Sequence, residues 1–112
     1  MSSETQMKSR RRSERVLISV PVELKGTNQD GQEISEPATA VVVSRHGALL
    51  RVVTQLKMGT TATVTHGFSR EAAEFRVVWL GERQADGRWD VGVEILTVDE
   101  AFWGIRFPPS KP

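Results

Sequence analysis

Six short segments of this chain are rich in apolar and β-branched residues, and clusters of turn residues separate them. The first spans residues 16–25, and its apolar residues recur at every second position: Val16, Ile18, Val20, Val22 and Leu24. A period of two with one apolar face predicts a half-buried strand. The other five segments span residues 38–44, 48–53, 61–66, 74–80 and 88–96. Six short strands at this spacing predict an all-β protein, a small six-stranded antiparallel barrel.

Proline and turn residues add detail to the predicted barrel. Pro21 has no backbone donor, so the first strand is expected to lie at an edge or to bend there. Residues 26–32 have turn composition, and Asp86-Gly87 marks a turn between the last two strands.

The end of the chain has a different pattern. Thr97 and Glu100 have capping-box spacing and precede Phe102 and Trp103, which predicts a short C-terminal helical turn packed on the barrel mouth. We therefore expect a flexible tail over residues 1–9, a single domain over 10–105, and a C-terminal tail over 106–112.

Length and composition limit the class of protein. The 112 residues are enough for one domain, and the absence of cysteine excludes disulfides and thiolate metal sites. The N-terminus is polar, and no segment approaches the length that spans a membrane. We expect a soluble, cytoplasmic protein with no membrane insertion.

Residue patterns typical of catalysis are missing from the sequence. His46 and His66 lie in different segments, have no spacing typical of a metal site, and are expected in turns or at the surface. There is no nucleophile elbow and no glycine-rich phosphate loop. The sequence therefore predicts a binding protein, with no enzymatic activity, no metal and no cofactor.

The positive charge is concentrated just before the first strand. Residues 8–15 carry a net charge of +4, whereas residues 16–112 carry −2. Arg11 and Arg15 stand four positions apart and can grip one compact anion, since each guanidinium donates two parallel hydrogen bonds to a phosphate or to a guanine edge. Taken alone, the segment is better explained as a solvated basic arm.

A second candidate segment covers residues 41–50. The second strand is expected to end at Ser44, to turn through Arg45-His46, and to use the backbone freedom of Gly47 before the third strand. Strict alternation places Ala40, Val42 and Ser44 on one face and Val41 and Val43 on the other, buried face. Taken alone, this segment is an ordinary hairpin turn.

Together the two segments resemble the PilZ domain family, whose members are six-stranded barrels that bind cyclic di-GMP. Residues 11–15 match its R-x-x-x-R motif, residues 42–47 match [D/N]-x-S-x-x-G except at the first position, and residues 77–96 resemble its last strands. The resemblance covers roughly residues 10–96. It implies that cyclic di-GMP contacts the following residues: Arg10, Arg11, Arg12, Arg15, Val42, Ser44, Arg45 and Gly47.

Val42 departs from the family motif, because valine accepts no hydrogen bond from a guanine edge. An unpaired donor there costs about 1–3 kcal/mol, so the resemblance implies weakened binding rather than none.

Three functions are weighed on this basis. The first is a cyclic di-GMP receptor whose basic N-terminal arm becomes ordered on the ligand and is then read by a protein partner. The second is a degenerate PilZ domain that binds no nucleotide and acts as a protein-interaction adaptor. A nucleic-acid-binding barrel has less support, because the body is acidic and most aromatic residues lie at apolar strand positions or in the C-terminal turn. We therefore expect no nucleic-acid polymer as a partner.

Overall fold

The computed structural model describes residues 15–97 and 101–104, and this part of the chain forms one closed antiparallel barrel. Its strands are β1 (Val16–Thr27), β2 (Glu33–Val43), β3 (Gly47–Val52), β4 (Thr61–His66), β5 (Ala72–Arg83) and β6 (Trp89–Ile95). Around the barrel they follow the order β1-β2-β3-β6-β5-β4, and β4 closes the sheet against β1. The predicted fold class is confirmed.

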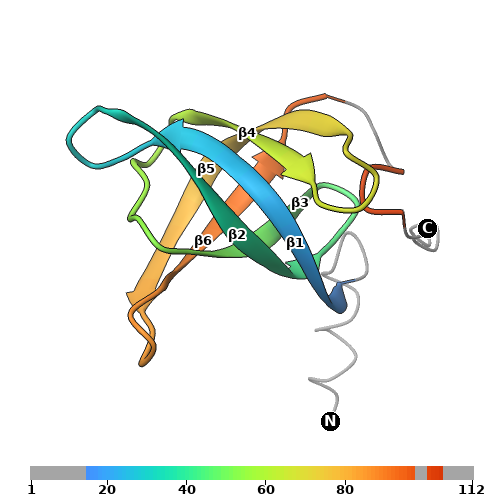
Figure 1. Ribbon diagram of the computed structural model, residues 1–112, viewed down its shortest axis with the longest axis horizontal. Coiled ribbons are helices and arrows are strands. Elements are labelled where there is room, and N and C mark those ends of the chain that lie inside the picture. Colours follow the sequence, from blue (N-terminus) through green and yellow to red (C-terminus); the bar gives the residue numbers. More distant parts are fainter. Residues whose placement is uncertain (1–14, 98–100, 105–112) are drawn as a thin grey trace, which may run out of the picture.

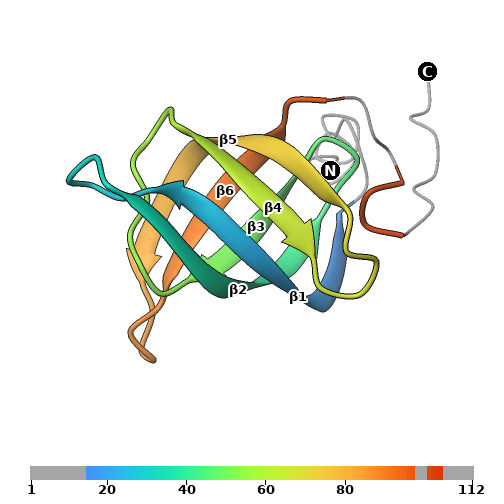
Figure 2. The ribbon, with the colours of Figure 1, turned by 45° about the horizontal axis from the view of Figure 1, so that its top comes forward.

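The connections fall at two ends of the barrel (Figure 1). The β1–β2, β3–β4 and β5–β6 connections lie at one end, and the start of β1 lies at the other end with the β2–β3 and β4–β5 connections and the turn at residues 101–104 (Figures 1 and 2). Residues from the start of β1 and from the β2–β3 turn are thereby brought to the same end, although they are far apart in sequence.

The core fills the inside of the barrel. Every strand contributes buried apolar side chains, and the largest of them that are fully buried include Leu24, Leu50, Phe75 and Phe102. The alternation predicted for the first strand is confirmed at Val22 and Leu24, which are buried, while the other three apolar side chains of that face pack partly buried against the core. Pro21 lies where β1 pairs with β2 but before its pairing with β4 begins at Val22.

Strict alternation in β2 is wrong at the end of the strand. Ala40 and Val43 are both fully buried, and Val41 and Val42 are only partly buried. Val41 is an extra residue in the pairing of β2 with β3, because Ala40 lies opposite Leu50 and Val42 lies opposite Leu49. This bulge places Ala40 inside the barrel, on the opposite face from Val42.

The C-terminal residues close the barrel end, as expected, but as a turn. In residues 101–104 the N–H of Gly104 donates to the carbonyl of Ala101, and no helix is present in the described part of the chain. Residues 98–100, where the helical turn was expected to begin, lie outside it. Phe102 and Trp103 are buried and pack edge-on, with ring centroids 4.8 Å apart.

His66 is a core residue, which corrects the expectation of a surface histidine, whereas His46 is exposed. The side chain of His66 is 5% exposed, and its ring lies 5.9 Å from that of Phe102. Its Nδ1 accepts hydrogen bonds from the backbone N–H groups of Phe68 and Ser69, at 3.1 and 3.2 Å. The ring therefore fixes the start of the β4–β5 loop.

No helix in the described residues is long and apolar enough to cross a membrane.

Candidate functional site

A pocket of about 600 Å³ lies on the outer face of the barrel, where β2, β3, β5 and β6 approach the start of β1. Arg15 and the β2–β3 turn form one side of it, and Trp79 of β5 forms another. Its lining residues are Arg15, Val42, Val43, Ser44, His46, Gly47, Ala48, Leu49, Val78, Trp79, Gly92, Val93 and Glu94.

Four of the eight residues suggested by the sequence line this pocket: Arg15, Val42, Ser44 and Gly47. Arg45 is half-buried in the same turn and is not one of the lining residues. Arg10, Arg11 and Arg12 lie outside the described residues. The structure thus brings the end of the basic segment to the turn that carries the second motif.

The β2–β3 turn is held by backbone hydrogen bonds. The N–H of Ser44 donates to the carbonyl of Gly47 at 2.9 Å, and the N–H of Ile95 donates to the carbonyl of His46 at 2.8 Å. A Cβ on Gly47 would collide with the carbonyl oxygen of Val93, and the φ of Gly47 is not in the left-handed region. Gly47 is therefore needed for close packing of β3 on β6, not for the backbone freedom that the sequence suggested.

One row of outward-facing residues crosses five strands beneath the pocket. The Cα partners run from Leu17 to Val42, Leu49, Gly92 and Trp79. Leu17 is 83% exposed, and Val42 and Leu49 are partly exposed. The row is apolar throughout, and the place of a side chain at Gly92 is taken by Trp79, whose Cβ lies 3.1 Å from where a Cβ of Gly92 would stand.

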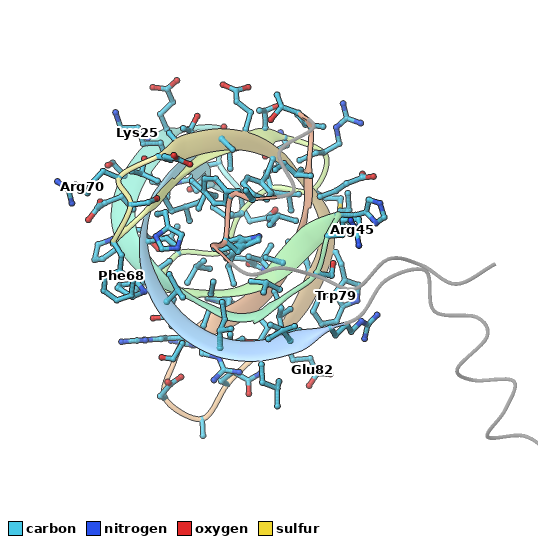
Figure 3. The ribbon with its side chains drawn as sticks, turned by 90° about the vertical axis from the view of Figure 1, so that its right-hand side faces the viewer. Lys25, Arg45, Phe68, Arg70, Trp79 and Glu82 are labelled. Carbon is cyan, nitrogen blue, oxygen red and sulfur yellow. The ribbon has the colours of Figure 1, made fainter. Side chains whose placement is uncertain are left out.

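Trp79 was not identified from the sequence, and a bulge in β5 explains its position. Val77 lies opposite Val93 and Trp79 lies opposite Gly92, so Val78 is an extra residue in β5. Strict alternation would bury Trp79 with Phe75 and Val77, but Trp79 is 51% exposed. Figure 3 shows Trp79 on the outside of the barrel, on the same side as Arg45 and opposite Phe68.

The charges of this face divide into a paired set and a set that lines the pocket. Arg51 Nε donates to Asp90 Oδ1 at 2.8 Å, and this hydrogen bond raises the pKa of Arg51 above its ordinary value. Among the described lining residues, Arg15 is the only basic residue apart from His46, and Glu94 is the only acidic one. The pocket therefore offers a cation, a carboxylate, a hydroxyl and an exposed indole.

These groups favour binding rather than catalysis. The side chains of Ser44 and His46 both line the pocket but share no hydrogen bond, so they form no nucleophile and base pair. No group of three or more acidic or histidine side chains in the described residues is arranged to hold a metal ion. An arginine and an aromatic ring in one pocket suit a ligand that combines an anionic group with a planar ring.

Comparison with known proteins agrees with the fold. The family model for the PilZ domain matches residues 9–103. The structure is similar to the PilZ domain with c-di-GMP of YcgR from Escherichia coli, with a TM-score of 0.57 and 13% sequence identity. That similarity covers 85% of this chain and 84% of the YcgR domain chain. No curated protein sequence matches the chain.

Proposed function

The chain belongs to the PilZ domain family, a family of non-catalytic receptors, and we propose that it binds cyclic di-GMP in the pocket beside Trp79. The observation that carries the proposal is that Arg15, Ser44 and Gly47, which come from two separate motifs, line one pocket. The YcgR domain, to which the structure is similar, is described with cyclic di-GMP.

Each lining group has a role that follows from its chemistry. Arg15 donates to a phosphate or to the O6 and N7 atoms of guanine, and its planar fork suits both. The Ser44 hydroxyl donates to or accepts from the ligand, and Gly47 lets the turn that carries Ser44 pack closely on β6. The open face of Trp79 gives a base a surface on which to stack.

The basic segment completes the proposed site. Arg11 stands four residues before Arg15, and both match the R-x-x-x-R motif. Because the ligand carries two phosphates, it neutralises arginines that otherwise repel one another, and residues 8–15 are expected to become ordered against the barrel. A protein partner would recognise the surface that forms when these residues become ordered.

Val42 lowers the expected affinity. It lines the pocket without an acceptor, whereas the family motif has an aspartate or asparagine at this position. We expect binding about one to two decades weaker than that of a family member with the complete motif, which corresponds to the 1–3 kcal/mol of one unpaired donor.

Calorimetric titration of the full chain with cyclic di-GMP tests the proposal. A saturable heat is expected, together with shifted amide NMR resonances at residues 44–47 and 79. No heat and no shifts at high ligand concentration would remove the receptor function.

A second function, a protein-interaction adaptor without nucleotide, is favoured by the apolar row from Leu17 through Val42 and Leu49 to Trp79. Contiguous exposed apolar surface is typical of sites that bind other proteins. The adaptor function predicts that cyclic di-GMP gives no heat, whereas the Leu17→Ser variant folds normally and loses a protein partner that the unchanged chain retains.

A further inference from the structure

We propose that Glu94 reads the guanine base in this pocket, through a contact separate from the one that is missing at Val42. The inference rests on the proposed binding of cyclic di-GMP and assigns the residue that gives the site its base specificity. Glu94 lines the same pocket as Arg15, Ser44 and Val42.

The register of β6 directs Glu94 toward the pocket. Val91 and Val93 are buried, so Gly92 and Glu94 lie on the outer face of the strand, two positions apart. Glu94 lies opposite Gly47 of β3, which has no side chain to cover it. The carboxylate of Glu94 therefore stands next to the motif turn, on the outer face between Gly47 of β3 and the exposed Arg76 of β5.

The carboxylate of Glu94 is available to a ligand. Within residues 15–97 and 101–104 it takes part in no hydrogen bond and no ion pair. Two other acidic groups near β3 are occupied: Asp90 accepts from Arg51, and Glu36 accepts from the backbone and hydroxyl groups of residues 53 and 54. Among the described residues that line the pocket, Glu94 is thus the one carboxylate, and its acceptor sites are open.

The chemistry of a carboxylate selects guanine. The N1–H and N2–H₂ groups of guanine lie side by side and donate to the two oxygens of one carboxylate, which only accepts hydrogen bonds. Adenine presents a lone pair at N1, which a carboxylate repels. Hypoxanthine keeps N1–H but has no 2-amino group, so it forms one of the two hydrogen bonds.

Electrostatics supports a base-reading role over a phosphate-binding one. A carboxylate in a site for phosphate alone would weaken binding, because like charges repel at short range. In a site for a nucleotide, Arg15 and Glu94 serve different parts of the ligand, one the anion and the other the base. The combination of these two residues in one pocket indicates that the ligand has both parts.

The test is calorimetry on the full chain with cyclic di-GMP, cyclic di-IMP and cyclic di-AMP. The unchanged protein should prefer them in that order. Glu94→Gln should weaken cyclic di-GMP binding by about tenfold, the effect of a lost charge-assisted hydrogen bond, and leave cyclic di-AMP binding equal or tighter. Glu82→Gln, which neutralises an exposed glutamate of β5 outside the pocket, should change none of the three affinities.

The possible results separate this inference from the proposed function. If Glu94→Gln tightens all three ligands equally, or if the unchanged protein binds all three equally, Glu94 does not read the base, although the receptor function stands. If the unchanged protein binds none of them, both proposals are overturned. The comparison of the three ligands on the unchanged protein tests the base specificity even if the Glu94→Gln variant does not fold.

Discussion

Trp79 lies directly opposite Gly92, and a Cβ on Gly92 would stand 3.1 Å from the Cβ of Trp79. The indole extends from there over Gly81, whose added Cβ would lie 2.6 Å from Trp79 Cη2. One face of the ring is thus seated on two glycines, and the other is open to solvent beside the pocket.

The open face of Trp79 should contribute to binding but little to folding. Trp79→Ala is expected to weaken cyclic di-GMP binding by about tenfold, because stacking of one base is worth about 1–3 kcal/mol. The melting temperature of the Trp79→Ala variant should change little, since half of the Trp79 side chain is already exposed. As a contrast, Phe75→Ala, which empties the core, should cost about 3–5 kcal/mol of unfolding free energy. Equal losses of stability in the two variants would show that Trp79 is a packing residue.

Arg15 should matter more for binding than arginines elsewhere on the barrel. Arg15→Ala removes a charge-assisted contact and is expected to weaken cyclic di-GMP binding by at least tenfold in calorimetry. Arg88→Ala, in the β5–β6 connection outside the pocket, removes the same charge and should leave the affinity nearly unchanged. If both variants lose affinity equally, binding depends on net charge rather than on the site.

Val42→Asn should restore an acceptor and tighten cyclic di-GMP binding by about tenfold, the contribution of one recovered buried hydrogen bond. Val42→Ala, which changes the size of the side chain without adding an acceptor, should not tighten binding. Calorimetric titration of both variants distinguishes the effect of a gained acceptor from the effect of a changed side-chain size. Unchanged affinity in a folded Val42→Asn variant would mean that the base makes no contact at this position.

Gly47→Ala should disrupt the pairing of β3 with β6, because its Cβ would collide with the carbonyl oxygen of Val93. The free energy of unfolding is expected to fall by about 1–3 kcal/mol, as for other overpacked sites. Gly26→Ala is the matched control, since its Cβ would meet only side-chain atoms at 3.4 Å or more. Chemical denaturation measures both, and a stable Gly47→Ala variant would contradict the close approach.

His66 should stabilise the barrel through two separable properties. His66→Phe keeps a ring but removes the acceptor for two backbone N–H groups, and His66→Asn keeps an acceptor but removes the ring. Each is expected to cost about 1–3 kcal/mol of unfolding free energy. Amide hydrogen exchange distinguishes them, because only His66→Phe should accelerate exchange at Phe68 and Ser69 relative to the rest of the barrel.

The strands could be predicted from the sequence because burial of one face repeats every two residues. Each of the six predicted segments lies on a strand, although β2 begins at Glu33 and not at residue 38, and the strict pattern fails where a bulge adds a residue, at Val41 and at Val78. A single extra residue leaves no mark in an apolar run such as 41–43, so Ala40 was wrongly assigned to the same outer face as Val42. His66 could have been placed correctly, since it continues the alternation of the buried residues Ala62 and Val64.

The candidate site was only partly predictable for a different reason. Arg15, Ser44 and Gly47 belong to local motifs and were identified by spacing. Trp79 and Glu94 reach the pocket because β6 pairs with β3 on one side and with β5 on the other. Strand order around a closed barrel is a long-range property, and nothing in the spacing of these two residues indicates it.

In this closed barrel, the residues that stabilise the fold and the residues proposed to bind the ligand are largely different. The two sets can therefore change independently in evolution. The core of the barrel lies inside, whereas Val42, Trp79 and Glu94 lie on the outer wall and contribute little to the core. Substitutions on that wall can accumulate at small cost in folding free energy. A hydrogen-bond acceptor can therefore be lost on one strand and another gained on a different strand while every intermediate sequence still folds.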